Sequence, residues 1–294
     1  MKLLVFGRDG QVGRALQSSL APLGEIIALG RVEANFDAPQ SLGPIIERER
    51  PDVIVNAAAY TAVDQAEDDR ATAWRVNAEA VGAIGAAARK NGVLVIHYST
   101  DYVYAGAGSA PQSETDATSP ASVYGASKLA GEALLRDSGA DAIILRTSWV
   151  YAPEGKNFPL TILRLARERE TLTVVADQIG APTPAGLIAD VTAAIIPRAR
   201  DRLGTYNLAP AGEVSWHGLA QFIVAEALAT GARLRLTPEA IVPIPSNQYP
   251  AKAPRPANSR LDTARLRTAF DLTLPPWQDG IRQWIRTLAT EGRL

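Results

Sequence analysis

Apolar residues in the first half of the chain form short runs, which longer amphipathic stretches separate. The runs that we expect to form strands are Lys2–Gly7, Glu25–Leu29, Asp52–Ala59, Val93–Thr100 and Ala142–Thr147. The stretches between them have the length and periodicity of helices. Strands that alternate with helices predict a parallel sheet covered by helices on both faces, which is a doubly wound α/β fold.

The pattern changes after about Trp149, where prolines become frequent and the helical stretches become shorter. We therefore expect one domain over residues 1–148 and mainly a smaller lobe over residues 149–294, with some segments of the second half returning to the first domain. A chain of 294 residues is long enough for either one large domain or two.

Distinctive residues follow the predicted strands at the point where each strand ends. They are the glycine-rich loop at Gly7, Asn56–Ala59, Ser99–Asp101 and Thr147–Trp149. The carboxyl ends of parallel strands lie at one edge of a sheet, and ligands of such folds bind outside that edge. The sequence thus predicts a single site at this edge.

The first strand leads directly into GRDGQVG, with glycines at positions 7, 10 and 13. Gly7 and Gly10 would let the backbone turn tightly and approach a pyrophosphate, while Gly13 would let the following helix pack close to the strand. The helix N-terminus would hold the anion. The spacing differs from the familiar G-x-G-x-x-G, but its position after the first strand favours a Rossmann-type dinucleotide site.

Tyr124 and Lys128 are four residues apart in SVYGASKLAGE and would share one helix face. A nearby ammonium would favour the charged form of the phenol and make it a usable acid or base for a carbonyl/alcohol pair. An isolated pair of this kind more often marks a solvated helix face. Here it accompanies a glycine loop and the strand that ends in Ser99-Thr100-Asp101, so we expect hydride-transfer chemistry.

Composition excludes several other classes of protein. The hydrophobic fraction of 47% with 21% charged residues is typical of a globular chain, and a net charge of −1 argues against nucleic-acid binding. No cysteine is present, and the two histidines, His97 in a predicted strand and His217 at a predicted helix start, lack ligand spacing. We expect a cytoplasmic protein without a metal site, without a membrane span and with His97 in the core.

Two polar segments have structural interpretations that compete with functional ones. Asp64–Glu67 has the pattern of a capping box at a helix start, without a catalytic role. The segment Tyr249–Arg260 contains three prolines and three cations. It is either an exposed, solvated loop or a segment in which Arg255 or Lys252 holds a diphosphate, because guanidinium groups bind phosphate oxygens in a planar fork.

Motifs along nearly the whole chain resemble those of the extended short-chain dehydrogenase/reductase family. They are GRDGQVG (7–13), RPDVIVNAAAYTAVDQAE (50–67), HYSTDYVY (97–104), YGASKLAGE (124–132), RTSWVY (146–151), DQIGAPT (177–183) and RPANSRL (255–261). Every short-chain reductase shares the Tyr/Lys pair. The segments DQIGAPT and RPANSRL are much more specific.

The resemblance implies the NADPH-dependent reduction of dTDP-4-dehydro-β-L-rhamnose to dTDP-β-L-rhamnose, the last step in making that activated sugar. It implies that Tyr124 donates a proton to the developing alkoxide and that Lys128 binds the nicotinamide ribose. It also implies that Thr100 orients the carbonyl oxygen. The expected substrate contacts are Thr100, Asp101, Tyr124, Trp149, Asn157 and Arg255.

Cofactor contacts are expected from the glycine loop, from the resemblance and from the end of the second strand. They are Gly7, Gly10, Gln11, Val12, Gly13, Arg31, Ala59, Tyr60, Thr61, Tyr98, Tyr124, Lys128 and Trp149. Enzymes that use NAD usually place an acid after the second strand, where this chain has Ala28-Leu29-Gly30-Arg31. This favours NADPH, with NADH possible as an alternative.

Two other functions stay open at this point. A regulatory subunit similar to the beta subunit of methionine adenosyltransferase would have this fold without needing reductase chemistry. A reductase or epimerase of another nucleotide sugar would keep the catalytic set and change the substrate lobe. The chain is expected to be a monomer or a homodimer. Some relatives are metal-bridged dimers, but the first helix, 11–20, has no acidic residue for such a bridge.

Overall fold

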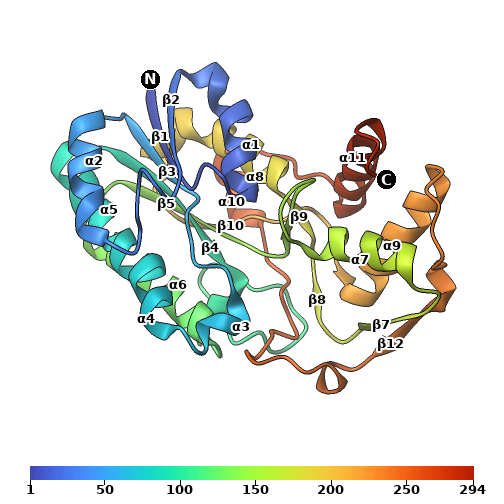
Figure 1. Ribbon diagram of the computed structural model, residues 1–294. Coiled ribbons are helices and arrows are strands. Elements are labelled where there is room, and N and C mark those ends of the chain that lie inside the picture. The colour runs from blue at the N-terminus through green and yellow to red at the C-terminus, as the bar shows by residue number, and fades with distance from the viewer.

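The computed structural model describes all 294 residues and is built around a six-stranded sheet. Each strand runs parallel to its neighbours, in the order β2-β1-β3-β4-β5-β10. The strands are β1 (Lys2–Phe6), β2 (Glu25–Leu29), β3 (Val53–Asn56), β4 (Leu94–Thr100), β5 (Ala142–Thr147) and β10 (Gly204–Asn207). The predicted parallel α/β architecture is confirmed (Figure 1).

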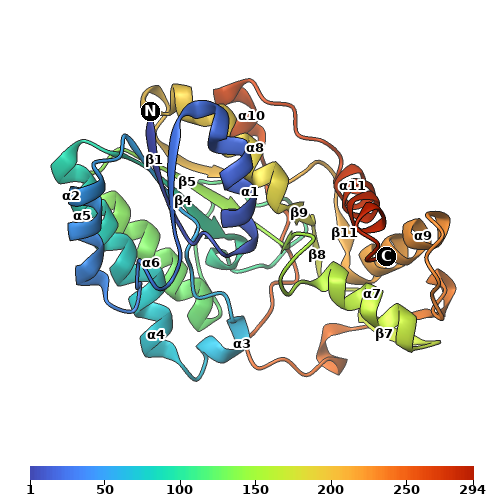
Figure 2. The same cartoon turned by 45° about the horizontal axis from the view of Figure 1, so that its top comes forward.

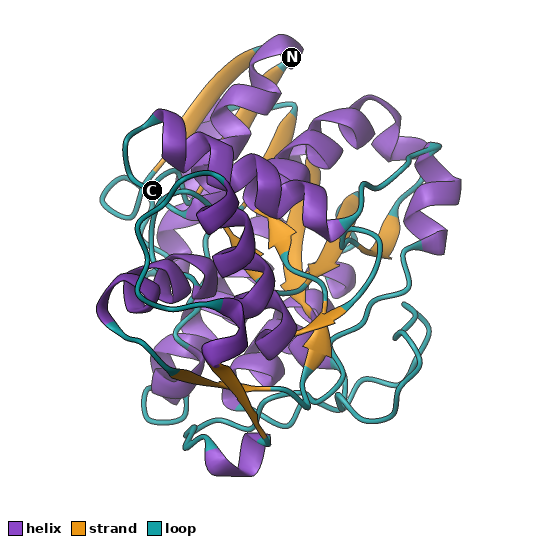
Figure 3. Cartoon of the chain, turned by 90° about the vertical axis from the view of Figure 1, so that its right-hand side faces the viewer, coloured by secondary structure: helices purple, strands orange, loops and turns teal.

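Helices cover both faces of the sheet because side chains alternate along each buried strand. In β1, Leu3 and Val5 belong to the core on one face, and Leu4 and Phe6 to the core on the other. The helices over the first face are α1 (Gln11–Leu20), α8 (Ala185–Ile195) and α10 (Ala264–Phe270). Those over the second face are α2 (Leu42–Glu49), α5 (Ala80–Asn91) and α6 (Val123–Asp137). Figures 2 and 3 show the strands between these helical layers.

All the predicted strands form, with bounds that differ from the prediction by at most a few residues. The main difference is β3, which ends at Asn56 rather than at Ala59. Beyond that point the Ala58 N–H donates to the Asn56 side-chain oxygen at 3.1 Å, so a side chain replaces the next bond of the ladder. The sixth strand, β10, was not predicted, because GTYN is short and has little apolar character.

A second core lies beside the carboxyl edge of the sheet. It is formed by three helices and a parallel strand pair, which are α7 (Phe158–Glu168), α9 (Trp216–Ala229), α11 (Trp277–Thr290), β7 (Leu172–Val175) and β12 (Ile241–Ile244). Short strands connect this unit to the sheet: β6 (Val150–Tyr151) pairs with β9 (Thr183–Pro184), and β8 (Ile179–Gly180) pairs with β11 (Val214–Ser215). No helix has both the length and the apolar character needed to span a membrane.

Several segments of the second half of the chain pack on the first unit, which is the six-stranded sheet with its covering helices. Helix α8 lies against α1, and β10 extends the sheet beside β5. In the other direction, the segment after β12 crosses from the second unit to α3 (Val63–Ala66), as Figure 1 shows at its lower edge. The exact division of the chain at residue 148 stays a prediction.

The predicted capping box at Asp64–Glu67 is wrong. Helix α3 begins after Ala62 and has no side-chain cap, and it is followed by α4 (Arg70–Trp74). Asp64 and Glu67 instead bind other parts of the chain. The Glu67 carboxylate accepts a hydrogen bond of 2.8 Å from the Val123 N–H at the start of α6. Glu67 thus connects the end of α3 to the start of α6.

Candidate active site

The glycine loop has the geometry that the sequence predicted. Gly7 has φ +86°, and a Cβ there would lie 2.6 Å from the Ala58 nitrogen. A Cβ on Gly13 would lie 1.9 Å from the Gly7 carbonyl oxygen, so only glycine allows α1 to start so close to β1. No side chain caps the N-terminus of α1. Its first N–H groups, from Gln11 to Gly13, therefore suit a pyrophosphate.

The end of β2 contains an acid that the sequence interpretation overlooked. Glu33 folds back so that its carboxylate accepts from the Gly30 N–H at 3.1 Å and pairs with Arg8 at 3.0 Å. Arg31 is exposed. The expectation that the end of β2 lacks an acid is therefore wrong. Glu33 comes three residues after Gly30, and a turn brings its carboxylate back to the end of the strand. The end of β2 is therefore next to one cation, Arg8, and one anion, Glu33.

Tyr124 and Lys128 project from the first turns of α6, whose start is fixed by Ser122. The Ser122 hydroxyl accepts from the Gly125 N–H at 3.1 Å. A Cβ on Gly125 would lie 2.3 Å from the Tyr102 carbonyl oxygen, so this glycine lets α6 approach the turn that follows β4. Tyr124 is half-buried, and Lys128 is buried at the end of β4.

The Lys128 ammonium does not contact the Tyr124 phenol in this structure. Its Nζ donates to the Tyr98 carbonyl oxygen at 2.6 Å and lies 3.4 Å from Nε2 of His97. Burial raises the pKa of Tyr124, Asp101 raises it further, and a hydrogen bond with Thr100 opposes the rise. The expected lowering of the Tyr124 pKa by Lys128 is therefore not found, because Nζ turns toward the backbone of β4.

The pKa of Lys128 depends on its burial and on a carboxylate one helical turn further along α6. Burial lowers the pKa of Lys128 to about 8, and the charge of Glu132 opposes this shift. Glu132 is fully buried and binds Arg146 of β5 through two hydrogen bonds of 2.9 and 2.6 Å. This fork-like pair holds the middle of α6 against the sheet.

Thr100 and Asp101 lie at the carboxyl end of β4, next to Tyr124. The Thr100 hydroxyl donates to Oδ1 of Asp101 at 3.0 Å and accepts from the Tyr102 N–H at 3.2 Å. Oδ2 of Asp101 is buried without a hydrogen-bond partner. Burial raises the pKa of Asp101 to about 6, although the nearby hydroxyl groups of Ser259 and Thr100 oppose the rise. The structure thus brings Thr100, Asp101 and Tyr124 together.

A cavity of about 720 Å³ opens between this edge and the second unit. Trp149, Trp216, Tyr102, Ser259 and Arg255 are among its lining residues. Trp149 has φ +50°, a strained conformation for a side chain of this size, and its ring stacks on Trp216 at 3.5 Å. A cavity lined by both apolar and polar side chains suits a sugar nucleotide.

Arg255 faces this cavity but is not free. Its Nη2 pairs with Oδ2 of Asp64 at 2.6 Å, and its Nη1 donates to the Tyr102 hydroxyl at 3.3 Å. Lys252, in the same segment, pairs with Asp68. The segment Tyr249–Arg260 thus has features of both interpretations, because Tyr249 to Lys252 are exposed while ion pairs attach Arg255 to α3 and Lys252 to Asp68. A diphosphate contact by Arg255 or Lys252 stays a prediction.

The remaining predicted residues divide between the two sides of the site. Asn157 caps α7 and donates to Oε1 of Gln11 at 2.8 Å, so it lies beside the glycine loop rather than among the residues that line the cavity. The backbone of Tyr60 is held by Asn77, between Ala59 and the exposed Thr61. The Tyr98 phenol binds Thr192 in the core at 2.8 Å, so only its carbonyl faces Lys128.

Sequence inspection missed three residues of this region. Tyr102, Trp216 and Ser259 contribute to the cavity. Tyr102 and Ser259 stand inside motifs that carry the family resemblance, which was a usable signal. Trp216 gave none, since its role depends on segments that are distant along the chain. Asn56 was expected at this edge, but its contact with His97 beneath Lys128 was not.

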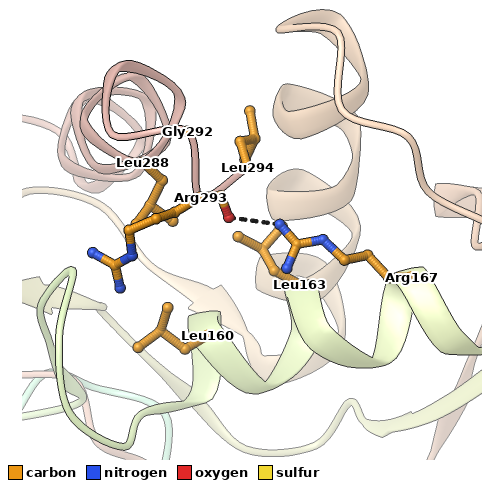
Figure 4. A pocket seen from close by; sticks show the side chains of 7 residues that line it. All are labelled: Leu160, Leu163, Arg167, Leu288, Gly292, Arg293 and Leu294. Atoms are coloured by element: carbon orange, nitrogen blue, oxygen red, sulfur yellow. Dashed lines mark hydrogen bonds between the residues drawn. The ribbon is translucent and has the colours of Figure 1, made fainter.

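A smaller cavity of about 490 Å³ lies near the C-terminus, on the side of α7 formed by Leu160, Leu163 and Arg167 (Figure 4). The Arg167 guanidinium donates to the Arg293 carbonyl oxygen at 2.6 Å. None of the predicted site residues lines this cavity. Two of them, Trp149 and Arg255, line the larger cavity together with Tyr102, which follows Thr100 and Asp101 in the chain. The substrate site is therefore assigned to the larger cavity.

A parallel sheet with a glycine loop, and Thr100 at the end of β4 beside Tyr124 and Lys128 of α6, define a Rossmann-type reductase of the short-chain dehydrogenase class. The family model described as RmlD substrate binding domain matches residues 1–290. A dTDP-4-dehydrorhamnose reductase of Burkholderia thailandensis is 49% identical over 99% of this chain and 100% of its own length. That of Salmonella typhimurium is 47% identical over 99% of both chains.

Solved structures agree with the sequence matches. The crystal structure of the dTDP-4-dehydrorhamnose reductase of Bacillus anthracis, in complex with NADP, aligns with a TM-score of 0.91 at 31% identity, over 97% of this chain and 99% of that one. The chain belongs to the dTDP-4-dehydrorhamnose reductase family.

Proposed function

We propose that this chain reduces dTDP-4-dehydro-β-L-rhamnose to dTDP-β-L-rhamnose with NADPH, and that it also accepts NADH. The observation that carries the proposal is the grouping of Thr100, Asp101 and Tyr124 beside a cavity in a member of this reductase family. The cytoplasmic location and a monomeric or homodimeric state stay predictions.

The glycine loop fits a nicotinamide dinucleotide. Gly7 and Gly13 leave no room for a side chain, and the uncapped N-terminus of α1 presents N–H groups to an anion. Gln11 to Gly13 would hold the pyrophosphate, and Lys128 would bind the nicotinamide ribose. When bound, the cofactor supplies the hydride that adds to the ketone carbon.

The residues of the chain supply the proton and the orientation. Tyr124 donates its phenolic proton to the oxygen that becomes the new hydroxyl, and its high pKa keeps that proton in place until negative charge develops on the substrate. The Thr100 hydroxyl, which donates its single proton to Oδ1 of Asp101 without substrate, would turn that proton to the same oxygen and orient it. Lys128 does not contact the phenol, because its Nζ is bound to the Tyr98 carbonyl oxygen, so its positive charge would stabilise the remaining phenolate at a distance.

Trp149 and Trp216 provide an apolar wall for the sugar and its nucleotide, and Arg255 provides a cation for the diphosphate. These roles separate the two ends of the site. The residues of the glycine loop would hold the cofactor, and the sugar nucleotide would bind between Tyr124 and the segment that contains Arg255.

The decisive experiment follows NADPH absorbance with enzymatically prepared dTDP-4-dehydro-L-rhamnose. Turnover supports the proposal, and competition with other nucleotide sugars tests the alternative of a different sugar substrate. Binding to another enzyme without turnover would support the regulatory-subunit alternative instead. The Thr100, Tyr124 and Lys128 set gives no reason to favour that alternative.

A further inference from the structure

His97 lies directly beneath Lys128 and has no part in the mechanism above. It is fully buried in β4, between Asn56 of β3 and Lys128 of α6. Its Nδ1 is 3.1 Å from the Asn56 side-chain nitrogen, and its Nε2 is 3.4 Å from the Lys128 Nζ. Burial and the charge of Lys128 both hold the pKa of His97 well below its usual value, so its ring is neutral.

The position of the proton on this ring follows from its neighbours. The Ala58 N–H points at the Asn56 side chain at 3.1 Å and can only donate, so the Asn56 atom that receives it is the oxygen. The Asn56 atom that faces His97 is then the amide nitrogen, which is a donor. Nδ1 of His97 must accept, and the single proton of the neutral ring sits on Nε2.

This assignment directs an N–H group of His97 toward the Lys128 nitrogen. A charged ammonium has only donors, so it meets the imidazole N–H donor to donor. A neutral amine has a lone pair that can accept from it. The opposite tautomer would suit the ammonium, but it would turn Nδ1–H against the Asn56 amide. The network of Asn56 and His97 therefore favours the uncharged form of Lys128.

We propose that His97, with its tautomer fixed by Asn56, is a positioning residue that opposes the ammonium form of Lys128 and so sets the pH above which the reductase loses activity. This inference rests on the proposed function, in which the positive charge of Lys128 stabilises the Tyr124 phenolate. It assigns a role to two residues that touch neither the cofactor nor the sugar.

Other groups also bear on the charge of Lys128. Tyr98 of β4 accepts from it through its carbonyl oxygen, and Tyr124 and Glu132 share its helix. Glu132 favours the ammonium, but its charge is shared with Arg146 of β5. The Asn56 side chain binds His97 and the Ala58 N–H and contacts none of these groups, so a substitution there acts first on the His97 tautomer.

The first test is the tautomer itself, measured by ¹⁵N NMR on histidine-labelled protein of the natural sequence. The chain has two histidines, so a His217→Gln variant assigns the signals. We expect His97 to carry its proton on Nε2 at neutral pH. A proton on Nδ1, or a charged ring, overturns the proposal. This measurement needs no turnover, so it is independent of the proposed function.

The second test reverses the tautomer. In Asn56→Asp the carboxylate still accepts from the Ala58 N–H, but it offers His97 an acceptor in place of a donor. Nδ1 then carries the proton, and Nε2 accepts from the Lys128 ammonium. We expect the pKa of Lys128, followed by NMR of labelled lysine, to rise by about one unit or more. The basic limb of the pH profile of kcat/KM should move by the same amount.

The added charge of Asn56→Asp would raise the pKa of Lys128 by itself, so a double variant separates the two effects. His97→Phe removes the ring nitrogens, and any shift that Asn56→Asp causes in that background is the direct effect of charge. We expect a clearly smaller shift there. An equal shift with and without His97 overturns the proposal. A uniform loss of rate at every pH, with an unchanged pKa of Lys128, would show that Asn56 and His97 have only a structural role.

Discussion

Arg255 and Asp64 form an ion pair of 2.6 Å that joins the proline-rich segment of the second unit to α3 of the first. Pro254 and Pro256 flank the arginine, and the Ala253 N–H binds the same carboxylate at 3.0 Å. The guanidinium is thus placed at the cavity before any ligand arrives. A diphosphate at this position would meet a preordered cation, which reduces the ordering cost of binding.

We expect Arg255→Ala to raise the KM for the dTDP-sugar while NADPH affinity stays nearly unchanged. Loss of a charge-assisted hydrogen bond costs about 1.5–3 kcal/mol, which corresponds to roughly ten- to a hundredfold in affinity. Lys252→Ala is the matched control, because Lys252 belongs to the same segment but does not line the cavity. An unchanged KM would remove Arg255 from the substrate site. Weaker NADPH binding would place the segment that contains Arg255 at the cofactor end of the site.

Tyr124→Phe should retain the fold and the cofactor affinity but reduce kcat by roughly 10²–10⁴, the usual contribution of a general acid. Steady-state assays and a fluorescence titration with NADPH measure the two quantities. Tyr206→Phe serves as the control, because it removes a phenol whose hydroxyl binds the Arg202 carbonyl oxygen away from the cavity. Turnover near the wild-type rate in Tyr124→Phe would show that the proton comes from another group.

The sequence sufficed for the sheet because its strands are buried on both faces. Leu3 to Phe6 and Leu94 to Tyr98 are continuous apolar or aromatic runs interrupted only by His97, and such runs are distinctive. Strand β10 escaped prediction because it is four residues long and gains its stability by pairing with β5. Its register depends on residues about sixty positions earlier, which no local pattern contains.

The site could be predicted only where one motif contains the whole arrangement. Gly7, Gly13, Tyr124 and Lys128 lie in such motifs. The direction of the Lys128 amine could not be predicted, because it depends on the Tyr98 carbonyl and on His97 in another element. The partner of Arg255 was equally out of reach, since Asp64 is 191 residues away. A local pattern suggested a helix cap for that acid instead.

Cofactor preference can be tested at the end of β2 with two substitutions, one that removes a positive charge and one that removes a negative charge. Arg31→Ala should raise the KM for NADPH more than that for NADH, because only NADPH has a 2′-phosphate. Glu33→Gln should lower the KM for NADPH, because it removes a negative charge and releases Arg8 from their 3.0 Å pair. Parallel kinetics with both cofactors provide the measurement. Equal effects on NADPH and NADH would exclude both side chains from phosphate recognition.

Asp101→Asn should stabilise the protein near neutral pH while reducing activity. Burial raises the pKa of Asp101 from the ordinary value of 3.8 to about 6, so between these values the folded state holds a proton that the unfolded state has lost. The free energy of unfolding therefore decreases as pH rises from about 4 to 6 and stays lower above that range. The shift corresponds to roughly 3 kcal/mol at 1.36 kcal/mol per unit.

Asparagine carries no charge and can still accept from Thr100, so the Asp101→Asn variant should avoid this loss. Denaturant unfolding at several pH values should show wild-type and variant stabilities converging near pH 4, diverging between about pH 4 and 6, and keeping that separation at higher pH. Curves that stay parallel would mean that Asp101 is not buried as a strained carboxylate.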